Sequence, residues 1–116
     1  MQPKSLRLLG LAMVAASGLW ATNASAACND GRNRNVTVIN RTAVTVRELY
    51  GSRVTTSNWE EDVLGSRVLP AGQSINVNWD DNSCECLFDF KAVLTNGNEI
   101  VARRVNVCAV SNWVIQ

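Results

Sequence analysis

Two acidic segments, residues 59–62 and 80–85, hold the side chains of this chain that are best suited to bind a ligand. The first reads Trp-Glu-Glu-Asp and the second Asp-Asp-Asn-Ser-Cys-Glu. Carboxylate oxygens are the ligands that Ca²⁺ prefers in proteins. The Asp-x-Asp-x-Asp-Gly spacing of a calcium-binding loop is missing, however, and this favours a solvated acidic rim. We predict no metal and no cofactor, and we retain a calcium- or small-ligand-binding domain as the alternative function.

The residues predicted to bind a ligand or partner are Trp59, Glu60, Glu61 and Asp62. Trp59 lies in a predicted loop. Its indole either closes one end of the core together with Val63 and Leu64, or is displayed to a partner. We favour the first arrangement, because large apolar loop residues near a small core are usually buried. Glu60 and Glu61 are predicted to be solvated.

Catalytic chemistry has little support in the sequence. The chain has no histidine, which excludes Ser-His and Cys-His nucleophiles and histidine metal sites. Serine and threonine are plentiful, but no recognisable lysine or terminal-amine motif would activate them. A pair of carboxylates of the glycosidase kind depends on separation in space, which a sequence does not give. We predict that the protein is not an enzyme and keep a small enzyme as the third hypothesis.

The first residues predict a signal peptide. Lys4 and Arg7 precede an almost wholly apolar run over residues 8–20, and small residues follow at 24–27. The run is shorter than the ~20 residues of a transmembrane helix, and the absence of adjacent arginines favours the general secretory route. We predict a leader over residues 1–26, a single domain over 27–116 with no membrane span, and a periplasmic or secreted location.

The charge of the mature domain is nearly balanced. The chain has eleven basic and ten acidic residues, and Lys4 and Arg7 leave with the leader, so the net charge becomes 9 − 10 = −1. A nucleic-acid-binding protein would carry a basic face, and we therefore predict no nucleic-acid partner. Most of the remaining basic residues are arginines, which are predicted to form surface ion pairs.

The sequence after the leader alternates between apolar and polar residues with a period of two. β-Branched and aromatic residues in this pattern predict strands over residues 36–40, 44–50, 74–79, 84–92, 99–107 and 113–115. No segment of the mature chain has the periodicity of a helix. The sequence predicts an all-β fold of about seven strands, a small antiparallel β-sandwich that is immunoglobulin-like or a small barrel.

The turn Asn96-Gly97 predicts a two-residue type I′ hairpin. Pairing outward from this turn keeps the apolar residues of both strands on one face. It also sets an acid opposite a base on the other face, which is favourable. The predicted pairs are Ala92 with Val101, Phe90 with Arg103, Phe88 with Val105, and Asp89 with Arg104.

Four cysteines in a small exported domain predict two disulfides. A Cys84–Cys86 bridge would strain its two-residue span. This leaves 28–84 with 86–108, or 28–86 with 84–108. Either pairing closes long loops and stabilises the fold by roughly 3–4 kcal/mol per bridge in the chain-entropy model. A lipidated Cys28 and a soft-metal site at Cys84 and Cys86 are weaker alternatives.

The hairpin register bears on the choice of pairing. It places Cys108 opposite Glu85, one residue from both candidate partners. Either a bulge near Val107 or a turn of more than two residues would correct this offset. We predict the bulge and a Cys86–Cys108 bridge, which leaves Cys28 to pair with Cys84.

Several short motifs together resemble a family of short exported bacterial β-domain proteins of uncharacterised function. They are Val38-Ile-Asn40, Val46-Arg-Glu-Leu-Tyr50-Gly-Ser52, Asn58-Trp59, Asp62-Val-Leu-Gly65, Leu69-Pro-Ala-Gly-Gln73, Cys86-Leu-Phe-Asp89 and Val105-Asn-Val-Cys108. The order resembles "Asn, Leu-Tyr, Trp-Gly-x-Asp-x-Leu-Gly, Pro-Gly, Cys-x-x-Asp, Cys", with Glu60 in place of the first glycine. The resemblance also implies the Cys86–Cys108 bridge, and it draws attention to Asp62, which we expect to accept hydrogen bonds from loop amides before Gly65.

This family supplies no function. Such proteins sometimes carry unrelated enzyme labels such as argininosuccinate lyase, which is a long, helical, cytosolic enzyme unlike this chain in length and chemistry. The sequence therefore predicts an uncharacterised, non-catalytic β-sandwich of the periplasm or the secreted fraction. We expect it to bind an unknown protein or envelope component.

Overall fold

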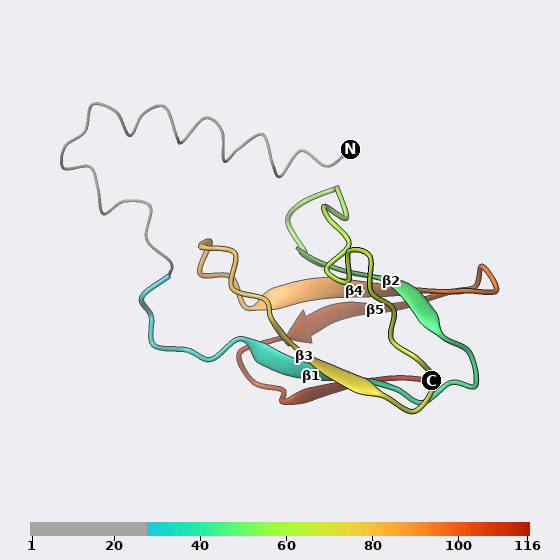
Figure 1. Cartoon of the computed structure of the whole chain (residues 1–116). Coiled ribbons are helices and arrows are strands. Elements are labelled where there is room, and N and C mark those ends of the chain that lie inside the picture. The colour runs from blue at the N-terminus through green and yellow to red at the C-terminus, as the bar shows by residue number, and fades with distance from the viewer. Residues whose placement is uncertain (1–27) are drawn as a thin grey trace.

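The alternating segments form six β-strands in the computed structural model, which describes residues 28–116 (Figure 1). The prediction of about seven strands is therefore wrong by one, and the predicted leader over residues 1–26 lies outside the described residues. The strands are β1 (Asn35–Asn40), β2 (Val46–Arg53), β3 (Ser74–Asn78), β4 (Leu87–Leu94), β5 (Glu99–Asn106) and β6 (Asn112–Ile115).

The strands form two three-stranded sheets with the orders β3-β1-β6 and β2-β4-β5. Figure 1 shows one sheet above the other, so the prediction of an all-β, sandwich-like fold is confirmed. The antiparallel prediction is wrong for one pair, because β6 lies parallel to β1. After β5 the chain crosses to the other sheet, and such a connection between sheets permits parallel pairing where a tight hairpin does not.

Aromatic rings fill the space between the sheets. The Phe90 ring lies 4.8 Å from that of Trp79 and 5.0 Å from that of Trp113, measured between centroids. Gly51 on β2 faces this cluster, and a Cβ atom there would overlap the Trp79 ring. The fully buried aliphatic residues around the rings are Val36, Val38, Val46, Leu49, Ala92, Val107 and Ile115.

The chain between β2 and β3 covers the free edge of β2. Val46 and Leu69 exchange two backbone hydrogen bonds of 2.9 Å, and the Val63 amide donates to the Leu49 carbonyl at 2.9 Å. The fully buried Asn40 side chain also donates to the carbonyls of Val44 and Leu69. These bonds satisfy backbone groups that an open edge would expose to another chain.

The β4–β5 hairpin differs from its predicted register. Leu94 N–H donates to the carbonyl of Asn98 at 2.9 Å, so the turn has three residues, 95–97. Gly97 alone among them has a positive φ, 91°, whereas a type I′ turn needs two such residues. As a result Phe90 pairs with Ala102 instead of Arg103, and Ala92 with Ile100 instead of Val101.

A β-bulge between Phe88 and Phe90 then restores the predicted pairing of Phe88 with Val105. The extra residue lies on β5 at Arg104, whose φ of 53° is left-handed. The bulge was predicted near Val107, some residues too far along the chain. Its actual position explains why Asp89 contacts the Arg103 side chain, and not that of Arg104.

Both predicted disulfides are confirmed. Cys28 is bonded to Cys84, and Cys86 to Cys108, with Cα–Cα distances of 5.2 and 5.4 Å. Val107 N–H donates to the Cys86 carbonyl at 2.8 Å, so Cys108 is reached diagonally across the hairpin without a bulge at Val107. The two bridges join the N-terminal segment and the end of β5 to the same three-residue stretch.

Candidate functional site

Asp62 fixes the chain that follows β2. Its Oδ1 atom accepts hydrogen bonds of 2.9 Å from the backbone amides of Leu49, on β2, and Leu64, in the loop. Leu64 is buried, with 2% of its surface exposed. The prediction that Asp62 binds loop amides is confirmed, and one carboxylate oxygen joins the loop to the strand beneath it.

Glu60 and Glu61 differ in environment although they are adjacent. Glu61 is exposed, as predicted, but Glu60 is buried with 5% of its surface exposed, so its predicted solvation is wrong. Glu60 has a φ of 65°, a left-handed conformation in which glycine meets no steric cost. The glycine of the family order therefore matches the backbone conformation that this position adopts.

Trp59 packs on the outer face of the β2-β4-β5 sheet. Its ring centroid lies 6.4 Å from that of Tyr50, and Lys91 Nζ lies 5.1 Å from both centroids. Tyr50 and Lys91 are cross-strand partners, pointing away from the core side that Gly51 occupies. The prediction that Trp59 plugs the end of the sandwich is thus wrong, because this aromatic–cation pair offers the indole a platform of its own.

Tyr50 is held by a second contact on the same face. Its hydroxyl donates a hydrogen bond of 2.7 Å to Glu48 Oε1. Burial and this hydrogen bond together raise the pKa of Tyr50 to about 12. The ring is therefore a neutral, fixed part of the surface on which Trp59 rests.

A cavity of about 260 Å³ opens beside Trp59, between the loop after β2 and the outer face of the sheet. We call it the Trp59 cavity. Ser52 within it is buried, with 4% of its surface exposed. The lining residues are Ser52, Val54, Thr56, Ser57, Asn58, Trp59, Asp89 and Arg103.

Asp89 and Arg103 supply the charges of the Trp59 cavity. Arg103 Nη1 lies 3.3 Å from Asp89 Oδ2, and the Arg104 amide donates to Asp89 Oδ1 at 2.9 Å. The Arg103 side chain is 68% exposed, and its guanidinium carbon lies 5.9 Å from the Trp59 ring centroid. Asp89 is thus held from two sides, while Arg103 keeps most of its donors free for a ligand.

The two acidic segments meet only in part. Glu61 lines a smaller cavity, of about 90 Å³, together with Asp80, Asp81 and Trp79. The Asp81 carboxylate already has partners: Arg53 Nε lies 3.3 Å from its Oδ2, and the amide and hydroxyl of Ser83 donate to its Oδ1. Within residues 28–116 these carboxylates do not converge closely enough to form a group that could hold an ion.

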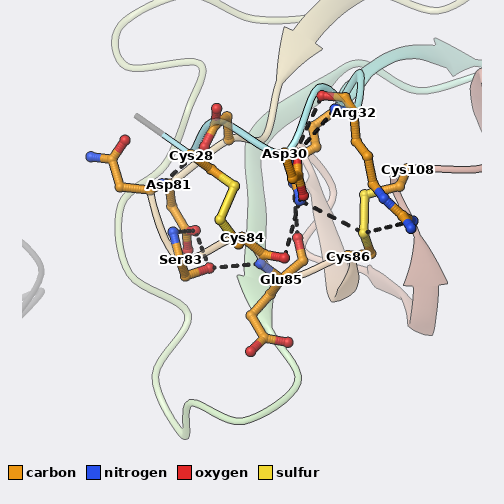
Figure 2. Close-up of a disulfide and its surroundings, with 12 residues drawn as sticks. Cys28, Asp30, Arg32, Asp81, Ser83, Cys84, Glu85, Cys86 and Cys108 are labelled. Carbon is orange, nitrogen blue, oxygen red and sulfur yellow. Dashed lines mark hydrogen bonds and ion pairs between the residues drawn. A yellow bond between two sulfur atoms is a disulfide. The ribbon is translucent and has the colours of Figure 1, made fainter. Parts of the chain in front are cut away.

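The one converging group of ligand-type side chains in the described part is Cys28, Asp30 and Cys84, shown in Figure 2. Both of its sulfurs belong to the Cys28–Cys84 bridge, and the remaining ligand-type group, the Asp30 carboxylate, is paired with Arg34. The arrangement is therefore that of a disulfide beside a carboxylate, and it differs from a metal centre in having no thiolate.

Arg34 organises this disulfide region. It is 3% exposed and donates to Asp30 Oδ2 at 2.7 Å and to the carbonyls of Cys84 and Glu85. The hydrogen bond from Arg34 holds the pKa of Asp30 well below its usual range. Sequence reasoning missed Arg34 by counting it among surface ion pairs. The spacing of Asp30 and Arg34 beside a cysteine was the available signal.

Comparison with protein-family models, with curated proteins and with solved structures found no match. Within residues 28–116 no helix has the length and apolarity to cross a membrane. The family resemblance therefore remains a prediction.

Proposed function

We propose that the protein is an exported, non-catalytic binding domain whose ligand- or partner-binding site is the Trp59 cavity. The observation that supports this most directly is the combination of an aromatic wall, a guanidinium with spare donors and uncommitted polar side chains around one concavity. Ligand sites are commonly concave, with a few convergent polar groups that fix orientation. The cavity lined by Arg67 and Pro70 has no aromatic wall, and the cavity lined by Glu61 and Asp80 has no guanidinium.

Export is supported by the two disulfides. A domain of this size buries a limited fraction of its surface, and disulfides form and persist in oxidising compartments. Both bridges involve the stretch from Cys84 to Cys86. A periplasmic or secreted location, reached through the predicted leader, accounts for this use of cysteine.

A binding role fits the way the site is fixed. Asp62 ties the loop to β2, and the Tyr50–Lys91 pair supports Trp59. Preorganised surfaces bind more tightly because less conformational entropy is lost on association. The site's charged groups, Asp89 and Arg103, pair with each other and are placed to recognise a ligand.

The test is crosslinking of the mature domain in its native envelope or secreted fraction, followed by identification of the crosslinked molecules. We expect specific crosslinks with the wild-type domain that are lost in Trp59→Ala. Val68→Ala is the matched control, since Val68 is an exposed valine in the same connection and lies outside the Trp59 cavity. Circular dichroism and thermal melting establish that both variants are folded.

Two results would contradict the proposal. One is the absence of any specific crosslinked partner of the wild-type domain. The other is an unchanged set of crosslinks in the folded Trp59→Ala variant, which would place the binding surface elsewhere.

A further inference from the structure

We infer that the Trp59 cavity binds a saccharide that carries a carboxylate group. This inference rests on the proposed function, because it names the ligand of that same site. Three features of the cavity carry it: an uncommitted hydroxyl and amide set, a guanidinium with spare donors, and an indole wall.

The hydroxyl and amide set matches the hydroxyl groups of a sugar. Among the described residues, the structure records no hydrogen bond for the side chains of Ser52, Ser57 or Asn58, all of which line the cavity. Ser52 is 4% exposed, and its hydroxyl is not among the fully enclosed polar atoms without a partner in the described part of the chain, so it stays open to a ligand. Hydroxyl and carboxamide groups both donate and accept, as sugar hydroxyls do, so a bound sugar would satisfy them.

Arg103 indicates that the ligand is acidic. Its guanidinium has five N–H donors, and the contact with Asp89 uses one nitrogen, Nη1. Asp89 is itself held by the Arg104 amide, so the pair positions the guanidinium at the cavity. Arginine binds carboxylates through two parallel hydrogen bonds with defined geometry. A carboxylate on the ligand would complete this fork.

The indole of Trp59 provides the apolar contact. A sugar ring presents C–H groups on its faces, and an aromatic ring offers them a large, rigid surface at low entropic cost. Lys91 and Arg103 lie 5.1 and 5.9 Å from the Trp59 centroid. These cation–π contacts hold the indole in place before a ligand arrives.

The size and polarity of the cavity favour a saccharide over other acidic ligands. Its volume of about 260 Å³ lies just below the ~300 Å³ at which ligand pockets usually begin. Its two apolar lining residues are the aromatic Trp59 and the aliphatic Val54. An apolar peptide side chain would leave Ser52 and Asn58 without partners, whereas the hydroxyl groups of a sugar ring would not.

Calorimetric titration of the folded mature domain tests the inference. The probes are short oligomers of glucuronate and of galacturonate and an amino sugar carrying a lactyl ether, each against its neutral counterpart. Acetate and inorganic phosphate are tested at the same ionic strength. We expect at least one acidic saccharide to bind at least about tenfold more tightly than its neutral counterpart, the factor that one lost charge-assisted hydrogen bond predicts, and acetate and phosphate to bind more weakly.

Paired variants assign the selectivity to Arg103. In Arg103→Gln the preference for the acidic saccharide should disappear, while Arg104→Gln should retain it, because Arg104 is also exposed but does not line the cavity. Asn58→Ala should weaken the acidic and neutral saccharides alike. Binding should also quench or shift the fluorescence of Trp59, and this change should be absent in Trp59→Phe.

Other outcomes would overturn the inference. Equal affinity for acidic and neutral saccharides, tight binding of acetate or phosphate alone, or no binding of any saccharide would each contradict it. If crosslinking to a partner still depends on Trp59 while no saccharide binds, the proposed function stands and only the ligand class is wrong. If crosslinking does not depend on Trp59, the proposed function itself fails.

Discussion

For single residues, the acidic segment 60–62 shows that three neighbouring carboxylates can have three different environments. Asp62 accepts two backbone hydrogen bonds, Glu61 faces solvent, and Glu60 is buried in a left-handed conformation. Asp62 was predictable, because a short acid in a loop commonly accepts neighbouring amides. The burial of Glu60 was not, because the burial of a loop residue depends on three-dimensional packing that the local sequence does not give.

Removing the Asp62 carboxylate should destabilise the domain. Asp62→Ala leaves the amides of the buried residues Leu49 and Leu64 without their acceptor, and we expect a loss of about 1–3 kcal/mol in the free energy of unfolding. Asp62→Asn retains an acceptor oxygen and should lose less. Urea unfolding measures both, with the exposed Glu61→Ala as the control. An Asp62→Ala variant as stable as Glu61→Ala would show that these bonds contribute nothing.

Tyr50 gives a clean measure of the platform beneath Trp59, because it is the only tyrosine in the chain. Its pKa is raised to about 12, from an ordinary value near 10. Folding therefore favours the neutral phenol, and this contribution to stability is fully present below pH 10 and is lost as the pH rises towards 12.

Spectrophotometric titration of the phenolate tests this value. We expect an ionisation midpoint near 12 in the folded protein and near 10 in denaturant. In Glu48→Gln the folded midpoint should fall but stay above 10, since burial is the larger cause and the hydrogen bond to Glu48 the next. A midpoint of 10 in the folded protein would mean that Tyr50 is not covered.

At the scale of elements, the alternation of residues predicted where strands lie and which side faces inward, but it did not predict how strands pair. Phe88, Phe90 and Ala92 face the core as expected. The register near the turn shifted by one, because a three-residue loop replaces the two-residue one. A period of two fixes the face of each residue, while turn length and bulges set its partner.

The same limit applies to the candidate site. Trp59 was identified from sequence, but Asp89 and Arg103 were not placed beside it. Their meeting depends on the bulge at Arg104, which brings Arg103 within 3.3 Å of Asp89. A shift of one residue in the β4–β5 register thus determines that Arg103, and not Arg104, lines the Trp59 cavity.

Gly51 on β2 lies directly against the ring of Trp79, the residue that follows β3. Its missing side chain makes room for Trp79, whose ring a Cβ atom would overlap. Gly51→Ala should therefore destabilise the domain by about 1–3 kcal/mol through overpacking. Ser74→Ala, an exposed strand substitution, should change stability by less than about 0.5 kcal/mol. Thermal and urea unfolding of the pair provide the comparison, and equal stability would contradict the close contact.

At the scale of the whole molecule, two sheets, one shared disulfide stretch and one covered strand edge give a rigid support for a small surface site. The acidic segments share one cavity, lined by Glu61, Asp80 and Asp81, without forming an ion-binding group among the described residues. The fold of the described residues is instead stabilised by the packing between the sheets, by the hydrogen bonds of Arg34 and by the two disulfides.

The melting temperature should accordingly be insensitive to calcium. A ligand that binds only the native state raises its stability in proportion to the logarithm of its concentration. We expect equal melting temperatures in saturating calcium and in chelator, by differential scanning fluorimetry at matched ionic strength. A calcium-dependent rise that is abolished by Asp80→Asn would instead support the alternative function.

The two bridges enclose nearly all of the described chain, and this bears on how the protein survives proteases. One bridge spans residues 28–84 and the other 86–108. A single cut in the exposed stretch over residues 65–68 therefore leaves two fragments joined by the Cys28–Cys84 bond. Within residues 28–108, only the peptide bonds on either side of Glu85 are not bypassed in this way. In gel electrophoresis a nicked molecule would migrate as one species until its disulfides are reduced. The residues of the Trp59 cavity from both fragments would remain covalently linked.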